Sequence, residues 1–163
     1  MTRFQECLED VLDLEGTEGL TQKQYDAYCS AHGGKLRPVA SITKPELGAV
    51  YNRVWKEARC EFAPAPLDTL IFLVAIHHGA AKAIKVLQST LGCVPDGVYG
   101  PETVEAMHEL VNANGVEPTC YEYISSLEDC YRDMLLMDPT QLIHKRELAE
   151  RIELLRDFIF QGA

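Results

Sequence analysis

The sequence predicts a mainly α-helical protein, and three observations support this prediction. Apolar residues recur at steps of three and four along most of the chain, which is the spacing of one face of a helix. Alternation of apolar and polar residues, which would indicate strands, never extends beyond about four residues. Prolines, glycines and capping-box residues divide the chain at intervals that fit the ends of helices.

The first part of the chain is expected to hold three helices. The first covers residues 2–14, and the next two begin at capping boxes, in which a threonine and the Gln or Glu three positions later bond each other's backbone. Thr21 and Gln24 open a helix that ends at the glycine pair 33–34. Thr43 and Glu46 open a helix that continues to about residue 58.

The second part is expected to hold five more helices. Prolines at 64 and 66 interrupt the chain before a buried apolar helix, and Gly92 ends the helix after it. Pro101 stands at a helix start, and Asp138-Pro139 divides the last two helices. The expected ranges are 67–77, 80–91, 101–114, 119–137 and 139–160. No repeat or long linker appears, so residues 1–163 are predicted to form a single domain.

Composition narrows the possible partners. The chain has 163 residues, 47% of them hydrophobic, and a net charge of −10. Because phosphate backbones and anionic membrane surfaces attract clustered positive charge, we expect binding neither to nucleic acid nor to an anionic membrane surface, and no membrane insertion is expected from the apolar runs either. The longest apolar run, 67–76, is too short to span a bilayer. The N-terminus has no apolar segment typical of a signal peptide, so we expect a cytoplasmic location at synthesis.

The six cysteines are spread through the chain and include no C-x-x-C pair. The spacing therefore predicts no zinc site, and we expect no metal or other cofactor. In a protein without a signal peptide the thiols stay reduced, so we expect free cysteines that serve as small core residues.

Glu15 stands apart from the other acids of the first helix. At about 100° per residue, Phe4, Leu8 and Val11 share one face, and Glu15 projects close to the same line. A carboxylate there loses hydration, which favours its protonated form and suits it to be a general acid. The alternative is that the helix has ended and the side chain turns into water. The acids on the opposite face are Glu6, Glu9, Asp10 and Asp13.

A second informative segment reads D-G-V-Y-G-P-E-T over residues 96–103. It resembles the D-G-x-x-G-P-x-T turn of peptidoglycan-binding helical modules. Residues 79–88 look like the G-x-x-x-A-x-x-x-L-Q segment that accompanies that turn, so residues 79–115 are a peptidoglycan-binding-like portion. The alternative is that the turn only holds two helices together, because turn chemistry accounts for its glycines and proline.

Five segments in order resemble glycoside hydrolase family 108, the lysozyme-like N-acetylmuramidases once called secretion activators of bacteria and phages. The resemblance covers about residues 4–112. It begins with the pattern F-x-x-x-L-x-x-V-L-x-x-E-G, here ending in Glu15-Gly16, and continues with G-L-T and Tyr25-Asp26. Tyr51, Trp55 and Cys60 form the third segment; Leu67-Asp68 with Phe72, and residues 85–103, complete the match.

This resemblance implies a lysozyme-like helical fold that cleaves the glycan backbone of peptidoglycan, with Glu15 in the position of the catalytic acid. It also implies substrate-binding residues at Tyr25, Asp26, Asp96 and Tyr99.

The sequence departs from that family at two places. Only Thr17 and Glu18 separate Gly16 from Gly19, so the loop that carries the family's second carboxylate is missing. Glu18 and Asp26 are the nearest acids, but neither matches the motif. His77-His78-Gly79 also replaces the usual Asn-x-Gly. Adjacent side chains on a helix diverge, so we interpret this pair as one core and one exposed histidine.

Three functions follow from these observations. The first is an active muramidase with a replacement carboxylate or with assistance from the substrate. The second is a lysozyme fold that has lost catalysis and binds glycan or a protein partner. The third is a structural component, for instance of a phage particle. A phage protein of either kind would leave the cytoplasm through a holin or inside the particle.

The last expected helix, 139–163 with its tail, carries an apolar stripe. The stripe either covers the core of its own domain or, extended by Phe158 and Phe160, forms a surface for self-association. Its members are Leu142, Ile143, Leu148, Ile152, Leu155 and Ile159.

Overall fold

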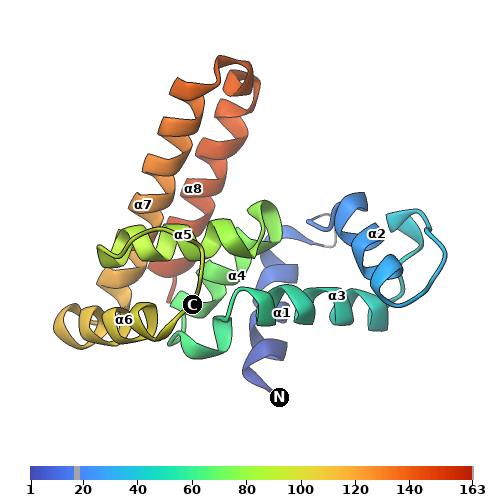
Figure 1. Ribbon diagram of the computed structural model, residues 1–163, viewed down its shortest axis with the longest axis horizontal. Coiled ribbons are helices and arrows are strands. Elements are labelled where there is room, and N and C mark those ends of the chain that lie inside the picture. The colour runs from blue at the N-terminus through green and yellow to red at the C-terminus, as the bar shows by residue number, and fades with distance from the viewer. Residues whose placement is uncertain (17–18, 163) are drawn as a thin grey trace.

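A computed structural model describes residues 1–16 and 19–162 and confirms a mainly α-helical fold. Figure 1 shows the helices arranged around a central pair, α4 and α5. The α-helices are α1 (Arg3–Glu15), α2 (Gln22–Ala31), α3 (Lys44–Glu57), α4 (Leu67–His78), α5 (Ala80–Leu91), α6 (Pro101–Asn114), α7 (Val116–Met137) and α8 (Lys145–Phe160). Three short 3-10 helices, η1 (Val39–Ser41), η2 (Cys60–Phe62) and η3 (Pro139–His144), complete the described part.

Capping boxes begin the first three helices. In α2 the Thr21 side chain accepts a hydrogen bond from the Gln24 backbone, and the Gln24 side-chain oxygen accepts one from the Thr21 backbone. Thr43 and Glu46 do the same at α3, as the sequence predicts, and Thr2 with Gln5 caps α1. These reciprocal bonds satisfy backbone N–H groups that a helix start otherwise leaves unpaired.

Helix α4 lies at the centre because its sequence is apolar on every side. All residues from Leu67 to Ile76 are buried, and α1, α3, α5 and α7 pack around them. A helix that is apolar all round has no face to present to water. Its one buried carboxylate, on Asp68, accepts two hydrogen bonds from the guanidinium of Arg3, at 2.6 and 2.8 Å. This contact holds the start of α1 against the start of α4.

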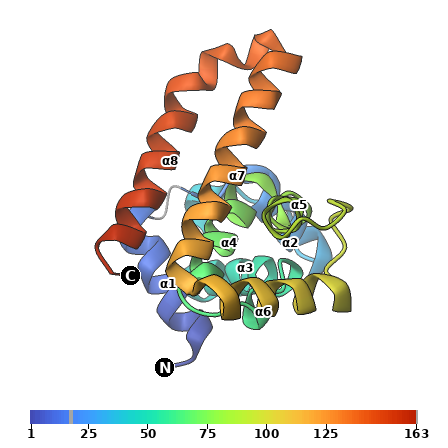
Figure 2. The same cartoon turned by 90° about the vertical axis from the view of Figure 1, so that its left-hand side faces the viewer.

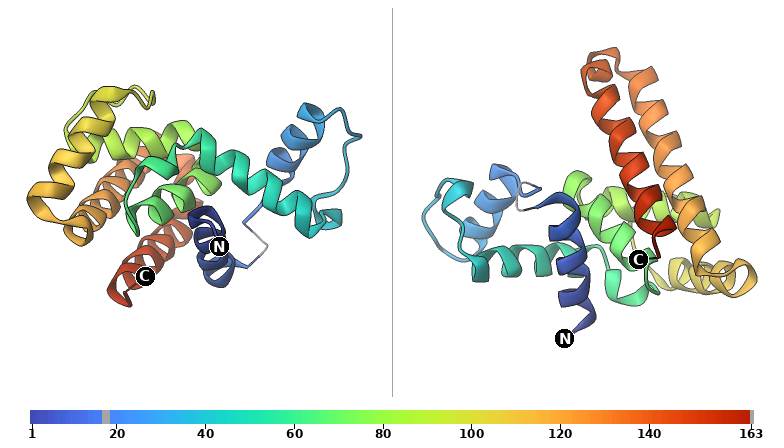
Figure 3. Two further views of the ribbon diagram at one scale, coloured as in Figure 1. Left: turned by 90° about the horizontal axis from the view of Figure 1, so that it is seen from below. Right: turned by 180° about the vertical axis from the view of Figure 1, so that it is seen from behind.

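Helices α7 and α8 form a long antiparallel hairpin whose far end stands clear of the other helices (Figure 2). Its stripe of Leu148, Ile152, Leu155 and Ile159 is buried, so this part of α8 covers the core of its own domain. Figure 3 shows the end of α8 returning to the side of α1. Leu14 of α1 and Phe158 of α8 line one groove there.

The ends of the hairpin helices differ from the prediction. Helix α7 begins at Val116 rather than Thr119, and α8 begins at Lys145 rather than Pro139. The Asp138 side chain accepts from the Thr140 backbone and starts a 3-10 turn instead of an α-helix. This turn leaves two residues of the expected stripe, Leu142 and Ile143, exposed at the tip. Phe160 is also exposed, whereas Phe158 packs against the core.

All six cysteines are free, and four of them are buried, as expected for small core residues. Among the described residues, no helix is both long and apolar enough to cross a membrane. In the same part of the chain, no group of three or more His, Cys, Asp or Glu side chains is placed to hold a metal ion.

Candidate active site

Glu15 is the last residue of α1, and its side chain turns inward rather than into water. Its Oε2 lies 2.5 Å from Nε2 of His77, at the end of α4, and the two atoms share a hydrogen bond. Only 13% of the Glu15 side chain and 15% of the His77 side chain are exposed. Gly16 follows Glu15 with a positive φ of 66°, and its backbone N–H donates to the Leu12 carbonyl at the end of α1.

The interpretation of His77 and His78 as one core and one exposed histidine is wrong. Both rings are half-buried because each meets a different helix. His78 Nε2 lies 2.6 Å from the hydroxyl of Tyr131 on α7 and 3.4 Å from the guanidinium of Arg151 on α8. Burial, and after it the positive charge of Arg151, lowers the pKa of His78 to about 4. His78 is therefore neutral at pH 7.

A third polar side chain faces Glu15 from α3. A Cβ atom added to Gly19 would stand 3.2 Å from Glu15 Oε2 and 3.5 Å from the hydroxyl oxygen of Tyr51. The same point is 3.7 Å from a methyl carbon of Ile76. Gly19 thus borders a small space that Glu15 and Tyr51 share. Burial, and after it the negative charge of Glu15, raises the pKa of Tyr51 to about 12.

Tyr25 and Asp26 lie on α2, which is tied to the end of α4 by a hydrogen bond from the Gln24 amide to the Ile76 carbonyl. The Tyr25 ring is buried, and its hydroxyl donates to Glu46 at 3.4 Å. Asp26 is half-buried and accepts from Gln22 at 2.8 Å. Glu18, the other acid considered from the sequence, lies outside the described residues.

Asp96 and Tyr99 belong to the turn between α5 and α6. In Figure 1 this turn (yellow-green) lies on the side of the molecule away from α2 (blue). The Gln88 amide, 2% exposed, donates to Asp96 at 2.8 Å, and the Val98 backbone donates to the same oxygen. Those two bonds, the backbone one first, lower the pKa of Asp96. The Tyr99 ring stacks on Phe62 at 6.0 Å. These contacts hold the turn in place between α5 and α6, which agrees with the alternative that the D-G-V-Y-G-P-E-T segment holds two helices together.

The structure therefore brings one predicted site residue, Glu15, together with two residues that the sequence analysis did not assign to the site, His77 and Tyr51. Tyr51 belongs to the third matching segment of the family resemblance, and His77 stands where that family has asparagine. Both positions were visible in the sequence, but only the packing of α1, α3 and α4 places them beside Glu15.

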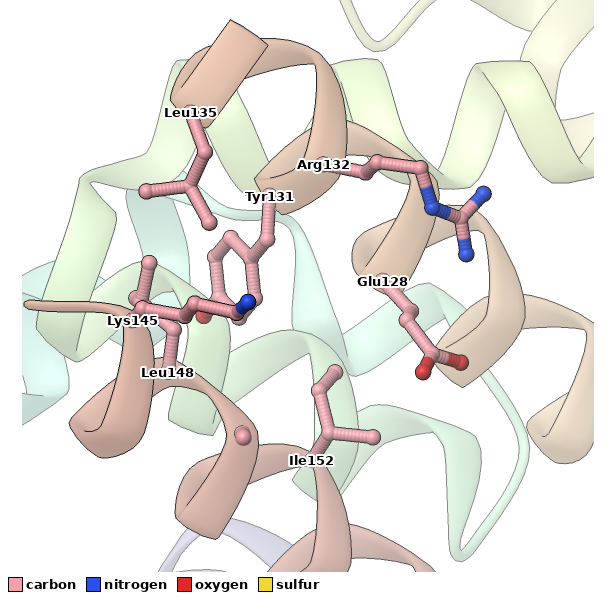
Figure 4. Close-up of a pocket in the computed structure, with 8 residues that line it drawn as sticks. Glu128, Tyr131, Arg132, Leu135, Lys145, Leu148 and Ile152 are labelled. Carbon is pink, nitrogen blue, oxygen red and sulfur yellow. The ribbon is translucent and has the colours of Figure 1, made fainter. Parts of the chain in front are cut away.

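A groove of about 200 Å³ lies between α7 and α8, away from the carboxylate (Figure 4). Tyr131, Leu148 and Ile152 give it an apolar floor, and Arg132 and Glu128 stand at its edge. The Tyr131 ring lines this groove, while its hydroxyl reaches His78, the residue after His77. The hairpin thus contacts the end of α4 that carries the Glu15–His77 pair.

Comparisons with known proteins identify a similar fold. No family model matches the sequence, and no curated protein matches it. Among solved structures, that of Brucella abortus SagA superposes with a TM-score of 0.76. The match covers 97% of this chain and 94% of that chain, at 21% sequence identity. The two chains share one fold over nearly their whole lengths.

Proposed function

We propose that this protein is a peptidoglycan-directed muramidase in which Glu15 is the general acid. The observation that carries the proposal is the enclosed carboxyl group of Glu15, hydrogen-bonded to His77 at 2.5 Å at the meeting point of three helices. The fold shared with B. abortus SagA and the resemblance to glycoside hydrolase family 108 support it. In that resemblance the Glu-Gly at the end of the first helix holds the catalytic acid.

The Glu15–His77 pair suits proton transfer. A general acid must hold a proton and must become a stable anion after giving it away. One proton lies between the Glu15 oxygen and the His77 nitrogen, whichever of the two it is bound to. When Glu15 protonates the glycosidic oxygen, the C–O bond breaks and the carboxylate remains beside His77. The step balances if the transferred proton comes from the other carboxyl oxygen, Oε1, so that the proton shared with His77 stays on Nε2 and donates to the new carboxylate.

The sugar cation that remains needs a second group. Hydrolysis of glycosides normally uses a second carboxylate, or else an acyl-amino group of the substrate itself. Of the two nearest acids in the sequence, neither of which matches the family motif, Asp26 on α2 is the one that the structure describes. Asp26→Asn abolishes cleavage if Asp26 activates water, and leaves the rate unchanged if the substrate assists.

A second candidate function is binding without cleavage, as a glycan- or protein-binding module or a phage structural component. Two observations favour it. First, the Glu15 carboxyl is already hydrogen-bonded to His77, at a position where the resembling family has asparagine. Second, the net charge of −10 disfavours approach to an anionic cell wall. An assay for new reducing sugar ends separates the two functions. A protein that only binds sediments with insoluble peptidoglycan and produces no new reducing ends.

The test is release of reducing sugar ends from purified peptidoglycan by wild type, Glu15→Gln and a matched control, Glu9→Gln. Glu9 is an exposed acid of the same helix. We expect Glu15→Gln to lose at least a hundredfold in rate, since the amide keeps the shape but gives no proton. Glu9→Gln should retain wild-type activity. An active Glu15→Gln variant removes Glu15 from the mechanism, and an inactive wild type that binds the pellet supports the second function.

A further inference from the structure

The hydroxyl of Tyr51 is buried and has no hydrogen-bond partner among the described residues. The side chain is fully enclosed, and its ring meets the edge of Phe72 with centroids 6.1 Å apart. Leaving a hydroxyl unpaired in the interior costs about 1–3 kcal/mol. Phenylalanine would fill the same place without that cost, so the core alone does not explain a tyrosine here.

The unpaired hydroxyl faces the carboxyl group of Glu15. Both oxygens lie within 3.5 Å of the point where a Cβ on Gly19 would stand. Gly19 is not among the glycines with positive φ, so its backbone does not demand glycine. The missing side chain leaves space beside both the Glu15 carboxyl and the Tyr51 hydroxyl.

From this arrangement we infer that Tyr51 is a positioning residue for Glu15: its hydroxyl donates a hydrogen bond to the Glu15 carboxylate once the acid has given up its proton. The inference rests on the proposed function and deepens it. A bond made only to the ionised form stabilises the product of the proton transfer, and therefore strengthens the acid at the moment of reaction.

Among the described polar side chains near Glu15, Tyr51 is the donor without a partner. His77, on α4, is the titratable group that contacts the carboxyl. His78, the next residue, is turned to Tyr131 and Arg151. The Gln24 side-chain amide of α2 already donates to the Ile76 carbonyl. The Tyr51 hydroxyl on α3 has no partner in the part of the chain that the structure describes, and burial keeps its phenol protonated well above neutral pH.

Two variants remove this bond in different ways. Tyr51→Phe deletes the hydroxyl and keeps the ring. Gly19→Ala places a methyl group 3.2 Å from Glu15 Oε2 and 3.5 Å from the Tyr51 hydroxyl oxygen, so that it crowds both groups. Tyr123→Phe is the matched control: it removes another buried hydroxyl, which donates to the Ala83 carbonyl at 3.3 Å.

The measurement is the titration midpoint of Glu15, followed by NMR of its carboxyl carbon and assigned with Glu15→Gln. We expect both variants to raise this midpoint by about one pH unit, because they remove a donor to the charged form. In the lytic assay, the alkaline limb of the pH–rate profile should move to higher pH by the same amount, while the maximal rate falls about tenfold. Tyr123→Phe should change neither.

A Tyr51→Phe protein with an unchanged Glu15 midpoint overturns the inference. In that case the variant should simply be more stable than wild type, because an unpaired buried hydroxyl has been removed. The titration needs no substrate. A shifted midpoint in a protein without lytic activity therefore supports the role of Tyr51 and contradicts only the proposed function.

Discussion

The contact between Arg3 and Asp68 allows a quantitative prediction about stability. The carboxylate of Asp68 is 2% exposed, whereas the side chain of Arg3 is 38% exposed. Asp68 also accepts a hydrogen bond from the Thr69 backbone at 2.7 Å. The two partners are thus buried unequally, and the two single substitutions should have unequal effects.

Arg3→Met leaves a buried carboxylate without its cation. Breaking a buried ion pair in this way costs about 3–5 kcal/mol. Because Arg3 is partly exposed and solvent screens the pair, we expect the lower end, about 3 kcal/mol. Asp68→Asn leaves a guanidinium that reaches water and Glu6, so we expect a loss of only about 1–2 kcal/mol.

Urea unfolding followed by circular dichroism measures both free energies. For a domain of this size, about 3 kcal/mol lowers the melting temperature by roughly 6–12 °C. Arg53→Met is the control: it breaks a surface pair with Glu57 and should cost less than about 0.5 kcal/mol. Equal losses for Arg3→Met and Asp68→Asn would refute the argument from unequal burial.

Two further predictions concern α4, α7 and α8. The pKa of His78 is lowered to about 4 in the folded chain. Between about pH 6.5 and 4, His78 is therefore protonated in the unfolded chain but neutral in the folded chain. The free energy of unfolding should therefore fall by up to about 3 kcal/mol over that range, and His78→Gln should flatten the dependence measured by urea unfolding. Ile152→Ala, in the buried stripe of α8, should lower the free energy of unfolding by about 2–4 kcal/mol. If the hairpin tip is a self-association surface, Ile143→Lys should dissociate an oligomer seen by light scattering without changing the melting temperature; a wild-type monomer at high concentration would remove that function from the tip.

Much of the fold follows from short-range chemistry that the sequence displays. Capping boxes at Thr21 and Thr43 start helices where predicted, because the bonds that satisfy their first N–H groups lie within four residues. Helix α4 is central because no face of it is polar. The hairpin tip was predicted less well. Asp138 and Pro139 signal an interruption, but whether a 3-10 turn or an α-helix follows depends on a local balance of backbone bonds.

The candidate site divides in the same way. The sequence by itself determined that Glu15 leaves the acidic face of α1, since helical periodicity fixes the direction of each side chain. Only the tertiary structure decided what Glu15 meets. His77 is 62 positions away in sequence, and its ring reaches the carboxyl because α1 and α4 end side by side. Tyr51 faces the same space because α3 packs on α4 and Gly19 leaves room. Periodicity sets the direction of a side chain within one helix, whereas its partner depends on how the helices pack, which is settled by all their buried faces at once.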